Sequence, residues 1–381
     1  MITDKQMLEK ANVLLNDAAI QVFEWFRKKG FRTCILKGQG NALMYPNLYS
    51  RTPGDIDVWI DASRERIMEY AQKKFELGDD IRLQHLETSL NGVPVELHFF
   101  PCSMNNPIYH ARLQKWFKRN ADLQCSNVVG LPDGAGDIAI PTSPFNVVYQ
   151  LCHLYHHFFD EGIGMRQIID YYVVMNDFWK VKESFSQPSR PSLPKEGSTA
   201  FPKPLSPQGT GDVTAPSRCS EPLRSKDGGP SKVSPDCAGC DRRGVSGDIA
   251  SDASVSSAFT TDSSASTALV VVQRELKYLG LWKFAGAVMY VLKEVLGLSE
   301  DKMIVPMDEK RGKLLLAEIL DGGNFGRHFT KYAGFTHQSM GKKYFLKIWR
   351  NMHFVRYYPA EALCEPLFRT WHFFWRLKYK K

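Results

Sequence analysis

The chain lacks several features that would place it in a special class of protein. It has no run of about 18 apolar residues, which excludes an ordinary membrane-spanning helix. Its first residues, MITDKQMLEKAN, contain no apolar core of a secretion signal. Its eight cysteines form no tight disulfide framework for a chain of 381 residues. We therefore expect a cytoplasmic protein that folds in a reducing environment.

One long segment also lacks core-forming residues. Residues 186–267 are dominated by Ser, Pro, Gly, Asp and Ala, contain neither Trp nor Tyr, and balance nine basic against nine acidic residues. Such a composition buries too little apolar area to offset the entropy lost on ordering. We expect a disordered insertion between residues 1–185 and 268–381. Its CAGC motif at 237–240 has no second cysteine pair and is weak evidence for zinc.

The flanking segments contain the residues of a folded protein. Hydrophobic residues make up 43% of the chain, and its length suffices for two domains. Residues 4–29 show helical periodicity, residues 32–36 predict a short strand, and Asn91-Gly92 predicts a tight hairpin turn. From Ser143 onwards the pattern is helical. The expected fold class is α+β, with a small mixed sheet flanked by helices and a mainly helical C-terminal region.

Two aspartates interrupt a stretch that otherwise predicts a buried strand. In RTPGDIDVWID, Asp55 and Asp57 flank Ile56, and Val58 and Ile60 supply the apolar content. Residues i and i+2 of an extended chain point to the same side, so the two carboxylates share one face. Like charges at that range repel unless a cation lies between them. The pattern therefore indicates a cation site.

Two further segments complete a pattern that suits phosphoryl transfer. The stretch LKGQG at 36–40 follows a predicted strand, and its glycines let backbone N–H groups approach an anion. The strand PVELHFF places Glu96 and His98 on one face. A phosphate-binding turn, a carboxylate pair and a third carboxylate on a neighbouring strand are what two-metal phosphoryl or nucleotidyl transfer requires.

These motifs resemble the DNA polymerase beta-type nucleotidyltransferase superfamily and, more closely, the bacterial family called uncharacterised nucleotidyltransferases. The shared elements are a Leu-Lys-Gly turn, a Tyr-Pro pair, an Arg before Gly-Asp-Ile-Asp, and a Glu-Leu-His strand. They stand here at 36–38, 45–46, 51, 54–57 and 96–98. The segments GIGMRQIIDYY at 162–172 and GGNFG at 322–326 are also similar, so the likeness extends to both sides of the insertion.

The resemblance implies a reaction and a metal site. It implies transfer of an NMP from an NTP such as ATP to a hydroxyl acceptor (a small molecule, a protein side chain or an RNA end), with Mg²⁺ or Mn²⁺ as cofactor. Asp55 and Asp57 would bind the metal that carries the triphosphate. Glu96 would hold the second metal or act as the base that activates the acceptor.

The resemblance also implies a nucleotide-binding set at the glycine turn. Gly38 would line the phosphates, and Lys37, Gln39 and Arg51 are the further candidates for nucleotide contact. The superfamily turn usually has Ser or Gly after its first glycine, whereas Gln39 follows Gly38 here. Lys37 would either contact phosphate or cap the strand. Arg51 would brace either the acidic pair or the triphosphate.

Other polar residues have two interpretations each. His98 is either a structural histidine or a direct participant in the site. The histidines at 153, 156 and 157 form either a metal-ligand set or part of an aromatic core, since 153 and 157 share a helix face. Arg166 and Asp170, four residues apart on a predicted helix, form either an ion pair or a site-facing group.

The end of the chain is basic and aromatic. Residues 341–381 carry ten Lys or Arg against two Glu, a net charge of +8 that equals the excess of the whole chain. We expect an amphipathic helix packed on the core, a helix on an anionic membrane surface, or a nucleic-acid platform. For the whole protein, the alternatives to an enzyme are a catalytically silent binding or regulatory protein and an accessory factor of envelope polysaccharide biosynthesis at the inner membrane face.

Overall fold

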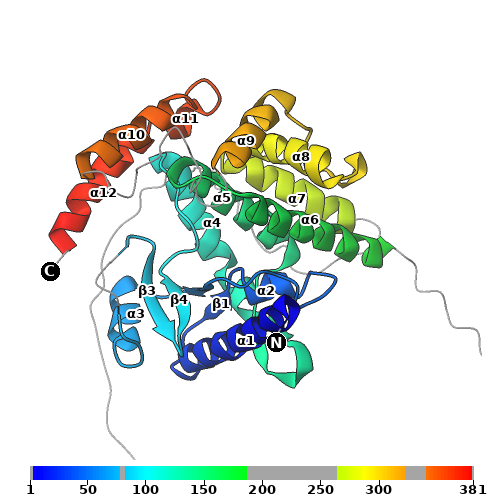
Figure 1. Ribbon diagram of the computed structural model, residues 1–381, viewed down its shortest axis with the longest axis vertical. Helices are drawn as coiled ribbons and strands as arrows, with labels where there is room; N and C mark the ends of the chain where they lie inside the picture. The colour runs from blue at the N-terminus through cyan, green and yellow to red at the C-terminus, as the bar shows by residue number, and fades with distance from the viewer. Residues whose placement is uncertain (1–2, 78–81, 187–263, 323–339, 380–381) are drawn as a thin grey trace, which may run out of the picture. The chain divides into compact units, whose positions relative to one another are not determined.

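The computed structural model describes residues 3–77, 82–186, 264–322 and 340–379 (Figure 1). The predicted insertion (except its two ends), its CAGC motif and most of GGNFG lie outside these residues. In chain order the elements are α1 (Asp4–Lys28), β1 (Thr33–Ile35), α2 (Gln39–Ala42), β2 (Ile56–Ile60), α3 (Arg64–Ala71), β3 (His85–Leu90), β4 (Val93–His98), α4 (Pro107–Ser126), β5 (Val128–Gly130), η1 (Pro132–Gly134), β6 (Asp137–Ala139), α5 (Ser143–Asp160), α6 (Met165–Ser186), α7 (Ser264–Tyr278), α8 (Trp282–Leu296), η2 (Glu300–Lys302), α9 (Glu309–Gly322), α10 (Met340–Met352), α11 (Pro359–Ala362) and α12 (Glu365–Tyr379).

A small mixed sheet lies in the N-terminal half, which confirms the predicted α+β class. Its strand order is β1-β2-β4-β3, with β2 and β4 parallel and the other two pairs antiparallel. Asn91 and Gly92 both have positive φ, 52° and 78°, as a two-residue hairpin turn requires. This turn fixes the register of β3 against β4. The hairpin predicted from the sequence is therefore present.

One face of the sheet packs against α1 (Figure 1). The helix begins at a capping box in which the side chains of Thr3 and Gln6 each accept the backbone N–H of the other residue. Its buried stripe includes Val22 and Phe26, which belong to the same apolar cluster as Ile35 of β1. The helix predicted for residues 4–29 is thus observed almost over its whole length.

The opposite face of the sheet packs against helices. Trp59 of β2 is 2% exposed and stacks on Phe145 of α5, with ring centroids 6.3 Å apart and planes at 5°. This core continues without a break through α6 to α9. Leu276 of α7 and Phe284 of α8 are fully buried in it. The helices that follow the predicted insertion therefore complete a core that begins before it.

The C-terminal helices are attached to this core partly through cations. Arg350 of α10 is buried and donates to the carbonyl oxygen of Phe158 at 2.8 Å. Lys347 and Arg369 each place a nitrogen 3.1 Å from Oδ1 of Asp160. Burial would raise the pKa of Asp160, but these two cations lower it. No helix in the described part of the chain is long and apolar enough to cross a membrane.

Glu361 of α11 is a second, buried link between the C-terminal helices and the core. Its carboxylate accepts the backbone N–H groups of Asn105 and Asn106, the latter at 3.2 Å. The side chain of Asn106 in turn caps α4 by accepting the N–H groups of Ile108 and Tyr109. Burial raises the pKa of Glu361 to about 7, although the two hydrogen bonds act in the opposite direction.

We expect this carboxyl group to make the protein less stable as the pH rises. The folded pKa of about 7 lies above the ordinary value of 4.5, so the stabilising contribution is fully present below pH 4.5 and is lost as the pH rises through 7. Relative to Glu361→Gln, the wild type should lose about 2.5 kcal/mol of unfolding free energy between pH 5 and pH 8. Denaturant unfolding at both pH values measures this difference. Parallel pH profiles for the two proteins would contradict it.

Candidate active site

The three carboxylates that the sequence predicts as metal ligands meet where β2 pairs with β4. Asp57 lies in β2 directly beside Glu96 of β4, because the two strands are parallel and in this register. Asp55 lies just before β2 rather than within it, and is exposed, whereas Asp57 is 2% exposed. One carboxylate oxygen from each of the three lies within 4.8 Å of the others. The structure therefore brings together the three predicted metal ligands.

The charges of this cluster are unequally compensated. The negative charge of Asp57 raises the pKa of Asp55, as expected for two carboxylates at close range. Burial would raise the pKa of Asp57 as well, but Lys37 and His98 hold it well below its usual range. Asp57 is therefore the stable anion of the group, and Asp55 is the one that a further cation would stabilise.

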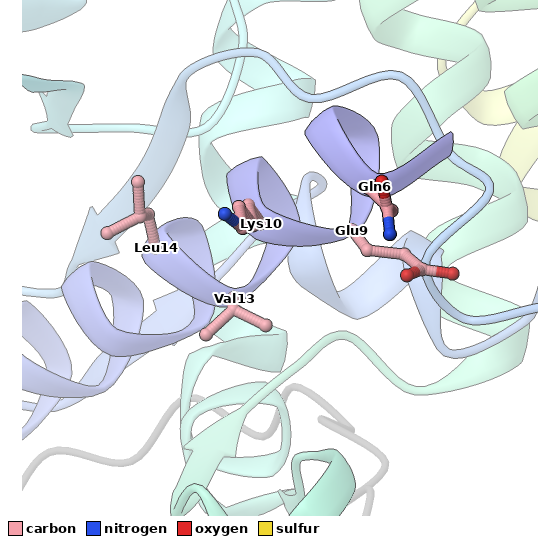
Figure 2. Close-up of a pocket in the computed structure, with 5 residues that line it drawn as sticks. All are labelled: Gln6, Glu9, Lys10, Val13 and Leu14. Carbon is pink, nitrogen blue, oxygen red and sulfur yellow. The ribbon is translucent and has the colours of Figure 1, made fainter. Parts of the chain in front are cut away.

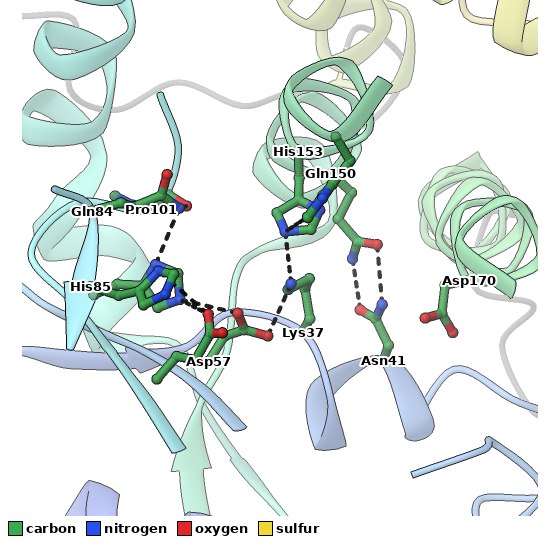
Figure 3. Close-up of polar contacts among 12 residues, drawn as sticks. Lys37, Asn41, Asp57, Gln84, His85, Pro101, Gln150, His153 and Asp170 are labelled. Atoms are coloured by element: carbon green, nitrogen blue, oxygen red, sulfur yellow. Dashed lines mark hydrogen bonds and ion pairs between the residues drawn. The ribbon is translucent and has the colours of Figure 1, made fainter. Parts of the chain in front are cut away.

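Lys37 lies between the sheet and α5 (Figure 3). Its Nζ is 3.0 Å from Oδ2 of Asp57 and 2.8 Å from Nε2 of His153. Burial would lower the pKa of Lys37, but the charges of Asp57 and Asp55 raise it. Burial lowers the pKa of His153 well below its usual range, and Lys37 adds to this effect. His153 is therefore a neutral acceptor, and Lys37 is a charged donor that neutralises Asp57.

His98 belongs to the site rather than only to the core. Its Nε2 is 3.1 Å from Oδ1 of Asp57 and 3.2 Å from Oε2 of Glu96. Burial would lower the pKa of His98, but hydrogen bonds to the two carboxylates raise it to about 9. Its Nδ1 lies 3.3 Å from Nε2 of Gln84. The imidazolium thus holds Asp57 and Glu96 at a fixed separation.

The glycine turn lies against the acidic segment, but its glutamine does not. Gly38 has φ of +51°, and a Cβ at this position would lie 3.4 Å from the carbonyl oxygen of Asp55. Gln39 is buried, and its Nε2 donates to the carbonyl oxygen of Asn12 and to the side chain of Asn16, both in α1. The side chain of Gln39 therefore braces α1 and does not join the carboxylates, and its nucleotide contact stays a prediction.

Arg51 is engaged with α6. Its Nε and Nη2 lie 3.0 and 2.9 Å from the two carboxylate oxygens of Asp170, and both side chains are buried. The hydroxyl of Tyr45, from the predicted Tyr-Pro pair, donates to the same carboxylate at 2.6 Å. The ion pair predicted between Arg166 and Asp170 is thus replaced by a long-range pair with Arg51. In this arrangement Arg51 holds the loop before β2 against α6.

Arg166 lies beside that same loop. Its Nη2 donates to the carbonyl oxygen of Thr52 at 2.9 Å. A Cβ on Gly54 would lie 2.8 Å from this nitrogen, so the glycine is what allows the guanidinium to approach the residue before Asp55. Of the two interpretations of Arg166, the structure therefore favours a position near the acidic cluster.

The structure separates the histidines into two groups. Among the described residues, the groups that could hold a metal ion are Asp55, Asp57, Glu96 and His85, Glu96, His98, so the histidines at 153, 156 and 157 form none. His85 was not a candidate from the sequence. It lies opposite His98 in the hairpin register, which the Asn91-Gly92 turn already determines. Burial lowers the pKa of His85 to about 4, so its ring is neutral at neutral pH.

A surface pocket occurs elsewhere, on the exposed side of α1 (Figure 2). Its lining residues come from the first turns of the helix and are Gln6, Glu9, Lys10, Val13 and Leu14. None of the predicted or observed site residues lines it. The acidic cluster is therefore distinct from this pocket.

A mixed sheet that places two aspartates beside a third carboxylate on a parallel strand is the arrangement expected of a nucleotidyltransferase. Residues 3–184 match the family described as uncharacterised nucleotidyltransferases, which confirms the resemblance seen in the motifs. The match makes this part of the chain similar to that family, and it includes Asp55, Asp57 and Glu96.

The chain is also similar to a solved structure, that of an antigenic nucleotidyltransferase-like protein from Paracoccidioides brasiliensis. The sequences are 15% identical, the TM-score is 0.29, and the match covers 42% of this chain and 75% of that chain. A similarity this low carries no argument about the present fold. No curated protein matches the sequence.

We expect removal of Arg51 to destabilise the domain because Asp170 would remain buried without its partner. The variant Arg51→Met should lose about 3–5 kcal/mol of unfolding free energy. Arg51→Met/Asp170→Leu should recover much of this loss, since it removes both buried charges. Denaturant unfolding measures both, with the half-exposed Arg166→Met as a matched control. Equal losses of unfolding free energy in the single and double variants would show that Arg51 does not stabilise the domain through its ion pair with Asp170.

Proposed function

We propose that the protein is a metal-dependent nucleotidyltransferase that transfers an NMP from an NTP to a hydroxyl acceptor. The observation that carries this proposal is the convergence of Asp55, Asp57 and Glu96, whose carboxylate oxygens lie within 4.8 Å of one another. The donor set fits Mg²⁺ or Mn²⁺, because these ions prefer carboxylate oxygens. When bound, such an ion neutralises the charge of the triphosphate and of the reacting oxygens.

The residues of the chain then have separate roles. Asp57 is held in place by Lys37 and His98 and would bind the metal from the buried side. Asp55 is exposed and would bind it from the open side. Glu96, whose side chain is 23% exposed, would bind a second metal or accept the acceptor's proton.

The proposed reaction is an in-line displacement at the α-phosphorus. The acceptor oxygen forms a bond to that phosphorus, the bond to the bridging oxygen breaks, and pyrophosphate leaves with the electron pair. The hydroxyl proton goes to Glu96 where that residue acts as base. Lys37 and the backbone at Gly38 are the proposed phosphate contacts, since both lie directly beside Asp55 or Asp57.

A catalytically silent binding protein is the second candidate, and one observation favours it. Lys37 and His98 already compensate the buried charge of Asp57, so this carboxylate does not depend on a metal ion for its charge balance. On this alternative the domain would bind a nucleotide without transferring any part of it. Incubation with each α-labelled NTP, Mg²⁺ and cell extract separates the two, because only the enzyme transfers label to an acceptor.

We expect divalent metal to stabilise the wild type through the three carboxylates. Titration with Mn²⁺ or Mg²⁺ should raise its Tm, corresponding to about 2.7 kcal/mol at 100 times the dissociation constant. Asp55→Asn/Asp57→Asn should show no such rise. Asp61→Asn, at the end of the same segment but paired with Arg32, is the matched control and should respond like the wild type. An equal rise in Tm in all three proteins would show that Asp55 and Asp57 do not bind the metal.

We further propose that the C-terminal helices dock on an anionic membrane surface. The two helices are joined by a hydrogen bond between the hydroxyls of Tyr344 and Thr370. Each exposes three large apolar side chains at i, i+4 and i+7, with exposed fractions between 48% and 72%. These are Phe345, Trp349 and Met352 of α10 and Leu367, Trp371 and Phe374 of α12.

The cations in the sequence of this C-terminal segment favour an anionic partner. Lys342 and Arg356 are exposed, and the last six residues of the sequence, RLKYKK, include four cations. Attraction to anionic lipid amounts to about 1 kcal/mol per basic residue near the surface. Aromatic side chains beside such cations suit the boundary between headgroups and acyl chains. This docking would place the domain at the inner membrane face as the peripheral factor considered above.

We expect the protein to cosediment with anionic vesicles and not with neutral ones, and less strongly at high salt. Trp371→Ala should weaken this binding. Leu320→Ala, which alters a 70% exposed side chain on α9 and therefore outside the two helices, is the matched control and should bind as the wild type does. Absence of binding to anionic vesicles at low salt would overturn the proposal. Binding to RNA with a steep salt dependence would instead indicate an RNA acceptor.

A further inference from the structure

A group of nitrogen ligands lies beside the carboxylate cluster and shares Glu96 with it. His85 of β3 and His98 of β4 are directly opposite each other in the antiparallel pair, with ring centroids 4.9 Å apart. Glu96 precedes His98 by two residues and therefore faces the same side of the sheet. One ligand atom from each of the three residues lies within 4.8 Å of the others.

Among the residues that the structure describes, His85 finds no hydrogen-bond partner for either ring nitrogen, although it is only 8% exposed. Its Nδ1 is 3.5 Å from Oε2 of Glu96, and its Nε2 is 3.9 Å from Oε1 of Glu87. Both distances exceed those of ordinary hydrogen bonds. Buried polar groups in folded proteins almost always have partners, and an ion is one of the standard reasons for an exception. The two ring nitrogens of His85 are therefore candidates for binding an ion.

The spacing of the three side chains suits a single small cation. Zinc binds imidazole nitrogen and carboxylate oxygen at about 2.0–2.2 Å, so neighbouring ligand atoms of a tetrahedral site are about 3.3–3.5 Å apart. Nε2 of His98 and Nδ1 of His85 lie 3.2 and 3.5 Å from the same oxygen of Glu96. The separation at His85 is too long for a good hydrogen bond, but both separations match two ligands bound to one ion, which would replace the proton that Nε2 of His98 shares with Glu96 and Asp57.

We propose that His85, Glu96 and His98 form a site for a divalent transition-metal ion of the Zn²⁺ class. Two imidazoles and one carboxylate, with a fourth position left open, are a ligand set found at catalytic zinc. Imidazole ligands favour Zn²⁺ over Mg²⁺, which prefers oxygen alone. The site is thus chemically different from the cluster of Asp55, Asp57 and Glu96, and the proposal rests on the proposed function only where it uses the shared Glu96.

The surroundings of the ring nitrogens support this assignment. The amide of Gln84 holds the outer side of the His98 ring in place, with its Nε2 3.3 Å from Nδ1 of His98 and 3.0 Å from the carbonyl oxygen of Pro101. An ion bound here would lie next to Asp57, whose Oδ1 is 3.1 Å from Nε2 of His98. It would activate a hydroxyl at its open position by lowering the pKa of that hydroxyl.

Cobalt provides the direct test, because Co²⁺ absorbs visible light intensely in tetrahedral nitrogen-containing sites and weakly in water. Metal-free full-length protein titrated with Co²⁺ should develop an intense band that saturates at one ion per chain and disappears when Zn²⁺ is added. Excess Mg²⁺ should not remove it. A weak spectrum like that of aqueous Co²⁺ in the wild type would by itself overturn the proposal, whatever the variants show.

Variants then show which residues bind the Co²⁺ that gives this band. His85→Gln should weaken Co²⁺ binding by more than about 100-fold, beyond the range of an outer-sphere partner. The matched control His353→Gln alters an exposed histidine just after α10 and should keep the band. Asp55→Asn should also keep it while losing the Mn²⁺ response of the carboxylate cluster, so failure of the proposed transfer reaction and failure of this site are distinguishable. An unchanged band in folded His85→Gln would assign the cobalt to another site.

Discussion

The buried carboxylate of Asp57 is the constraint on which the rest of the site depends. Strand alternation sends Trp59 into the helical core, and Asp57 must then face the same side of the sheet. A charge at 2% exposure requires compensation from its neighbours. Lys37 provides it from the end of β1 and His98 from β4. Because Lys37 also contacts His153, the balance of one charge joins the sheet, the glycine turn and α5.

The cation that the aspartate pair requires is thus, in part, supplied by the chain itself. The Lys37 ammonium lies at Oδ2 of Asp57, where a metal ion would also bind, so the two compete for one oxygen. Lys37 compensates the charge of Asp55 only in part, and the charge of Asp57 raises the pKa of Asp55. Metal affinity should therefore come mainly from Asp55 and Glu96, while the cost of displacing Lys37 from Asp57 reduces it. On the proposed function, this balance would set how tightly the domain holds its metal ion.

Local patterns in the sequence predicted the elements of the sheet and much of the site. The Asn91-Gly92 turn fixes the hairpin register. Counting outward from this turn along both strands places His85 opposite His98, so this pair was predictable from the sequence. Partners that lie far apart in the sequence were harder to predict. The i, i+4 spacing predicted that Asp170 would pair on its own helix, but no rule of spacing identifies Arg51, far away in sequence, as a better partner. Pairing of this kind depends on which loops the tertiary fold buries.

The C-terminal helices are a second case in which the sequence pattern alone does not predict the packing. Their periodicity indicates an amphipathic pair, and the ordinary expectation is that the apolar side packs inward and the basic side is solvated. In α10 the arrangement is the opposite, because its polar side chains bind the C-terminal end of α5. The last carbonyl groups of a helix have no partner within it and attract positive charge. Arg350 and Asn351 donate to the carbonyl oxygens of Phe158 and Phe159, and Lys347 lies at Asp160. With these polar groups turned to the core, the aromatic side of α10 is left facing outward.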